Sequence, residues 1–117
     1  MTEKQARKAI LWAMTWFKIQ DWDVTVLLQD EAPPWVADRS SAAIQPDANL
    51  KHALLWVQPH DNEAIDAVMH EITELSFYDS GYYGGGWRYT DEEGPYHHLI
   101  FRIAALMTKA YEANVKP

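Results

Sequence analysis

Residues 68–77, "VMHEITELSF", carry the apolar and charged pattern that organises this chain. Apolar residues recur at helical spacing through and just before this stretch, namely Ile65, Met69, Ile72 and Leu75. This spacing predicts a helix over residues 61–78 with one buried face. His70 and Glu74 are four residues apart and point the same way beside that face, whereas Glu71 lies one step around the helix. The helix therefore presents one imidazole and two carboxylates next to a core.

Two interpretations of His70 and Glu74 are open. In the H-E-x-x-H helix of zinc proteases, two ligands one turn apart hold the ion, and the glutamate beside the first ligand acts as the general base. A carboxylate can replace the second imidazole, because both ligand types bind zinc at nearly the same distance. Alternatively, His70 and Glu74 form an i,i+4 ion pair on an exposed face, worth a few tenths of a kcal/mol.

A zinc site with an open coordination position needs a third protein ligand. The stretch "GPYHHLIFRIAAL", residues 94–106, supplies His97 and His98 in the first turn of a predicted helix. At 100° per residue, His97 lies nearer the apolar face of this helix and His98 points away from it. His97 is thus the better ligand candidate. Its alternative role is packing on Tyr96 or Trp87.

The rest of the chain predicts a small α+β domain spanning residues 1–117. Its expected order is a helix capped by Thr2, three strands, a helix, a glycine- and tyrosine-rich loop and a last helix. The corresponding ranges are 2–19, 22–29, 39–46, 50–58, 61–78, 79–95 and 95–113. The three helices are expected to pack on one face of a short sheet of three, possibly four, strands. Inward-facing residues are expected to include Trp16 and Phe17 in the first helix, and Leu99, Ile100, Ile103, Leu106, Met107 and Ala110 in the last.

Composition limits the possible functions. The net charge is −7, from 17 acidic and 10 basic residues, which argues against a nucleic-acid-binding surface. The absence of cysteine excludes disulfides and thiolate zinc sites, so any metal needs His and carboxylate ligands. The first residues lack a hydrophobic signal core, and no apolar run reaches the length of a membrane span. A cytoplasmic protein that binds no membrane is expected.

The whole chain resembles the small zincin-like metallopeptidases encoded by bacteriophages and prophages. Their last helix opens with a ligand glutamate in a pattern like E-H-L-I-x-R-L-A, and residues 97–104 here read H-H-L-I-F-R-I-A. His97 therefore stands at the position of the ligand glutamate, and Glu74 at that of the second ligand histidine. The ligand set of two imidazoles and one carboxylate is kept, although two positions have exchanged identity.

The resemblance implies a metal-dependent hydrolase that cleaves a peptide or protein substrate. His70, Glu74 and His97 would hold Zn²⁺, or another divalent ion such as iron or manganese, and Glu71 would be the general base. The loop would offer an oxyanion donor or substrate contact from Tyr82, Tyr83, Tyr89 or Arg88.

Two other functions are compatible with the sequence. The first is a zincin-like protein that has lost catalysis and serves as a binding module. Its motivation is Glu74, which departs from the H-E-x-x-H motif. The acidic charge suits a phage-encoded inhibitor that imitates nucleic acid, although the carboxylates are scattered along the chain. Oligomeric state is not indicated by the sequence.

Overall fold

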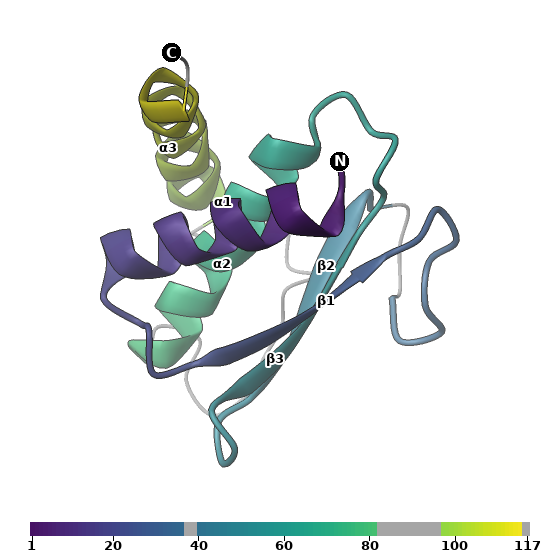
Figure 1. Ribbon diagram of the computed structural model, residues 1–117. Helices are drawn as coiled ribbons and strands as arrows, with labels where there is room; N and C mark the ends of the chain where they lie inside the picture. The colour runs from purple at the N-terminus through teal and green to yellow at the C-terminus, as the bar shows by residue number, and fades with distance from the viewer. Residues whose placement is uncertain (37–39, 82–96, 116–117) are drawn as a thin grey trace.

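The computed structural model describes residues 1–36, 40–81 and 97–115, and it has the predicted α+β class. Three helices and three strands follow one another in the predicted order (Figure 1). The elements are α1 (Glu3–Phe17), β1 (Asp23–Leu28), β2 (Ala42–Asp47), β3 (His52–Val57), α2 (Ala64–Asp79) and α3 (His97–Val115). β1 and β3 are shorter at both ends than predicted, whereas β2 begins only at Ala42 and extends one residue beyond the predicted end, to Asp47.

The sheet is mixed, with the order β1-β3-β2. The central strand β3 pairs in parallel with β1, where Val24 lies opposite Ala53, and antiparallel with β2, where Ile44 lies opposite Leu55. No fourth strand occurs in the described residues. β2 is therefore an edge strand, and its Pro46 is tolerated there because an edge strand leaves some N–H groups without a ladder partner.

Helices α1 and α2 form a second layer over one face of this sheet. In Figure 1, α1 and α2 cross above the strands, and α3 stands beside α2 on the side away from the sheet. Fully buried side chains of α2 fill the space between helices and sheet, among them Val68, Met69, Ile72 and Leu75. The central position of α2 places the His70–Glu74 turn at the edge of the core.

The first helix begins at the predicted cap. The Thr2 hydroxyl accepts a hydrogen bond from the Gln5 amide (3.1 Å), and the Gln5 side chain accepts one from the Thr2 amide (2.8 Å), which completes a capping box. The prediction that Trp16 faces inward is wrong, since it is 63% exposed. Three buried alanines (Ala6, Ala9 and Ala13) let α1 approach its neighbours closely. Trp16 lies outside this buried face and stacks on Trp12, with the ring centroids 5.7 Å apart.

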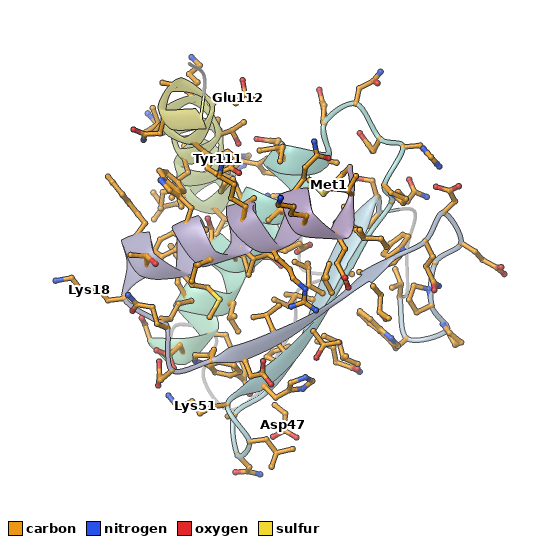
Figure 2. The ribbon with its side chains drawn as sticks, viewed as in Figure 1. Met1, Lys18, Asp47, Lys51, Tyr111 and Glu112 are labelled. Carbon is orange, nitrogen blue, oxygen red and sulfur yellow. The ribbon has the colours of Figure 1, made fainter. Side chains whose placement is uncertain are left out.

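The last helix buries a narrower stripe than predicted. Ile100 and Met107 face inward as expected, but the inward positions assigned to Leu99 and Leu106 are wrong because both are exposed. The buried stripe also contains Ala104 and Tyr111, and Tyr111 is labelled in Figure 2. The Tyr111 ring meets the Trp12 ring edge-on. The cause is that α3 packs on other helices and not on the broad surface of the sheet, so it is covered along one narrow face only.

The two ends of α2 are held by polar contacts. The helix begins at Ala64, three residues later than predicted, and the Asp61 carboxylate accepts a hydrogen bond from the Glu63 amide (2.7 Å) just before it. At the other end, the Asp79 carboxylate accepts hydrogen bonds from the Trp22 indole (2.9 Å) and the Lys51 ammonium (3.0 Å); Lys51 is labelled in Figure 2. Burial raises the pKa of Asp79, but these two hydrogen bonds and the positive charge of Lys51 together outweigh it and bring the pKa below its ordinary value.

Candidate metal centre

His70 and Glu74 are brought together by α2 itself. One helical turn separates them, and Nε2 of His70 lies 3.2 Å from Oε1 of Glu74. The pair is sheltered, with 15% and 6% of the two side chains exposed. The alternative interpretation of these residues placed an ion pair on an exposed face. The observed pair lies instead in a depression at the edge of the core.

His97 joins this pair from the first turn of α3. One ligand atom from each of His70, Glu74 and His97 can be chosen so that all three lie within 4.8 Å of one another. His97 is half-buried, whereas His98 is exposed and does not belong to this group, as helical geometry predicted. The three side chains thus converge from two helices on a common point and could hold a metal ion.

The donor set fits a divalent ion. Two ligand atoms that each lie about 2.1 Å from a tetrahedral zinc ion are roughly 3.4 Å apart, close to the 3.2 Å between His70 and Glu74. Bringing all three donors to that spacing needs a movement of roughly 1 Å, which side-chain torsions can supply. Glu74 is buried, and the described contacts of its carboxylate include no lysine or arginine. A buried carboxylate needs a charge partner, and a cation would supply it.

Glu71 lies beside this group. It is 7% exposed, and it lines, together with His70, Glu74 and His97, a cavity of about 460 Å³. The opposite wall comes from the start of β2 and the residues before it, through Ser40, Ser41, Ala42 and Ala43. The candidate metal group and a carboxylate outside it therefore share one cavity between α2, α3 and the edge strand.

Phe101 contacts both imidazoles and was not identified from the sequence. Its ring centroid lies 4.7 Å from that of His70 and 4.5 Å from that of His97, with an edge-to-face arrangement in each case. The two histidine rings are 5.9 Å apart. Phe101 follows His97 by four residues, which is one helical turn, so the sequence "HHLIF" was sufficient to predict the contact between these two side chains. We infer that the phenyl ring fixes the orientation of both imidazoles.

Replacing Phe101 with alanine is expected to weaken metal binding by roughly tenfold to a hundredfold, the usual cost of losing a group that orients a ligand. Cobalt(II) titration followed by visible absorption measures this affinity. Phe101→Tyr keeps the ring and should restore most of it. Leu106→Ala removes a side chain that is 68% exposed on the same helix and serves as the control. Equal affinities of Phe101→Ala and the unmodified protein would contradict the orienting role.

The remaining sequence-based candidates have different outcomes. Tyr82, Tyr83, Tyr89 and Arg88 lie outside the described residues, so their oxyanion or substrate roles stay predictions. Among the other histidines, His52 Nε2 lies 2.9 Å from the Thr25 hydroxyl, and His60 lies 3.7 Å from the Asp30 carboxylate. Neither belongs to the candidate metal group.

Comparison with known proteins identifies no relative of this chain. No family model, no curated protein and no solved structure matches this chain. The assignment of the site therefore depends on the geometry of His70, Glu74 and His97. In addition, none of the helices in the described part of the chain is long and apolar enough to cross a membrane.

Proposed function

We propose that this protein is a zinc-dependent hydrolase of the metallopeptidase kind, related to the small zincin-like proteins of phages and prophages, that acts on peptides or proteins in the cytoplasm. The observation that carries the proposal is the convergence of His70, Glu74 and His97 beside the buried carboxylate of Glu71. Two imidazoles and one carboxylate form a ligand set used by catalytic zinc.

The chain's own residues suit peptide hydrolysis. Zinc, when bound, lowers the pKa of water and polarises a carbonyl group. Glu71 would then take the proton from the attacking water and pass it to the leaving amine. Tyr82, Tyr83 and Tyr89, which lie outside the described residues, would offer the oxyanion donor, and Arg88 a substrate contact.

The position of the edge strand β2 is suited to binding an extended peptide substrate. Its first residues, Ala42 and Ala43, form one wall of the cavity, and only its β3 side is paired within the sheet. An extended peptide can add to such an edge through main-chain hydrogen bonds. Strand addition here would lay the peptide across the cavity that contains the candidate ligands.

Metal analysis tests the proposal directly. Full-length protein purified without chelators and reconstituted with zinc should retain about one ion per chain on elemental analysis. Zinc at about 100 times its dissociation constant should stabilise the fold by about 2.7 kcal/mol and raise Tm by roughly 10 °C. Excess chelator should reverse the shift. A zinc-free protein with unchanged Tm would contradict the proposal and favour the zincin-like binding module without catalysis.

A further inference from the structure

Two carboxylates of the cavity belong neither to the candidate ligand set nor to the proposed general base. They are Glu63, the N-cap residue of α2, and Asp66 in its first turn. The Glu63 side chain makes no capping hydrogen bond in the described structure. Asp66 accepts a hydrogen bond from the Thr108 hydroxyl of α3 (3.0 Å). The cavity thus has an acidic end that the proposed chemistry does not require.

These carboxylates lie along the same helix as the candidate metal group. At 1.5 Å per residue, Asp66 precedes His70 by about 6 Å and Glu63 precedes it by about 10 Å. Ala67, which also lines the cavity, lies between them and His70. With Ala42 and Ala43 on the opposite wall, small side chains leave room on both sides. A peptide with its carbonyl group at the candidate metal group would therefore run past Asp66 and Glu63.

The charge of the cavity favours a cation at this end. Its described lining contains four carboxylates, from Glu63, Asp66, Glu71 and Glu74, and no lysine or arginine. One divalent ion offsets two of these charges, so negative charge remains when the site is loaded. Several basic side chains of the protein lie instead on α1, at Lys4, Arg7 and Lys8. A cationic group would thus gain charge-assisted hydrogen bonds that a neutral or acidic group would not.

We propose that Glu63 and Asp66 bind the ammonium or guanidinium group of the substrate, one or two residues from the bond that is cleaved. A lysine ammonium on its four-carbon stem can span the one helical turn, about 6 Å along the helix axis, that separates His70 from Asp66. A free amino terminus offers the same chemistry. The inference rests on the proposed hydrolase function and names the class of substrate, a cationic peptide.

Matched peptides test this preference on the full-length, zinc-loaded protein. One set is blocked at both ends and carries lysine, norleucine or glutamate at a single position scanned along the peptide. A second set contains no basic side chain but has a free amino terminus. We expect kcat/KM for the best lysine peptide to exceed that of its norleucine match by about tenfold. Preference for the second set would assign the site to an amino terminus.

Three variants connect the preference to the named residues. Glu63→Gln and Asp66→Asn should each reduce the ratio of lysine to norleucine activity, and the pair together should bring it close to one. Glu112→Gln removes an exposed carboxylate near the far end of α3 (Figure 2) and is the control for net charge. Raising salt should weaken the preference of the unmodified protein as well.

A binding measurement separates this inference from the proposed function. Zinc-loaded Glu71→Gln is expected to bind the lysine peptide about tenfold more tightly than the norleucine peptide, measured by fluorescence anisotropy. Hydrolysis without charge preference would overturn the acidic subsite and leave the hydrolase function intact. Selective binding by a protein that never hydrolyses any peptide would support the subsite and overturn the hydrolase. Equal binding of both peptides would overturn the subsite.

Discussion

Glu71→Gln is expected to abolish peptide hydrolysis, with kcat falling by about 10²- to 10⁴-fold, while zinc stays bound. Gln keeps the size of the side chain but cannot accept a proton from water, so the contribution of general base catalysis is lost. His70, Glu74 and His97 are unchanged, and elemental analysis should still find the ion. Steady-state kinetics on a peptide substrate and zinc analysis on the same sample measure the two quantities.

The control for Glu71→Gln is Glu31→Gln, which makes the same change at an exposed position in a loop. Its kcat should match that of the unmodified protein. A Glu71→Gln variant with full activity would remove Glu71 from the mechanism. Loss of zinc from this variant would instead make Glu71 a ligand, contrary to the assignment of the group to His70, Glu74 and His97.

His97→Ala is expected to weaken zinc binding by more than about a hundredfold, because it removes one of three ligands, a larger loss than that of an outer-shell partner. The adjacent His98→Ala is its matched control, since His98 is exposed and lies outside the candidate group. Competition against a chromogenic chelator measures both affinities. The reverse result, in which His98→Ala loses the ion and His97→Ala does not, would show that His98 is the third ligand and that the assignment to His97 is wrong.

Much of the site was predictable because helical periodicity acts over short distances. The four-residue spacing of His70 and Glu74 fixes their common direction on α2, and the apolar stripe of α3 distinguishes His97 from His98. The resemblance to phage zincin-like proteins predicted that α3 returns to α2 at this point. Sequence spacing within one helix could not predict this return, because it depends on how the two helices pack.

Positions at the margins of the helices were the ones predicted wrongly. Trp16, Leu99 and Leu106 are large and apolar, and periodicity alone places them inside. Leu99 and Leu106 are exposed because α3 packs on other helices and is covered along one narrow face, whereas Trp16 is exposed because the buried face of α1 is made mainly of small alanines, Ile10 and Met14. The acidic end of the cavity was missed for a related reason. From the sequence, Glu63 and Asp66 look like ordinary solvent-facing residues, and only the fold shows that both line the cavity, Glu63 as an exposed residue and Asp66 as a half-buried one.

The division of the three candidate ligands between α2 and α3 has a consequence for folding. An ion shared by Glu74 and His97 would act as a cross-link that closes the intervening stretch of chain into a loop. Such a cross-link removes conformational entropy from the unfolded chain, as a disulfide does, in a protein without cysteine. Coordination would therefore hold the first turn of α3 against α2. The apparent affinity for the ion would be proportional to the fraction of molecules in which that turn is packed against α2 before the ion binds.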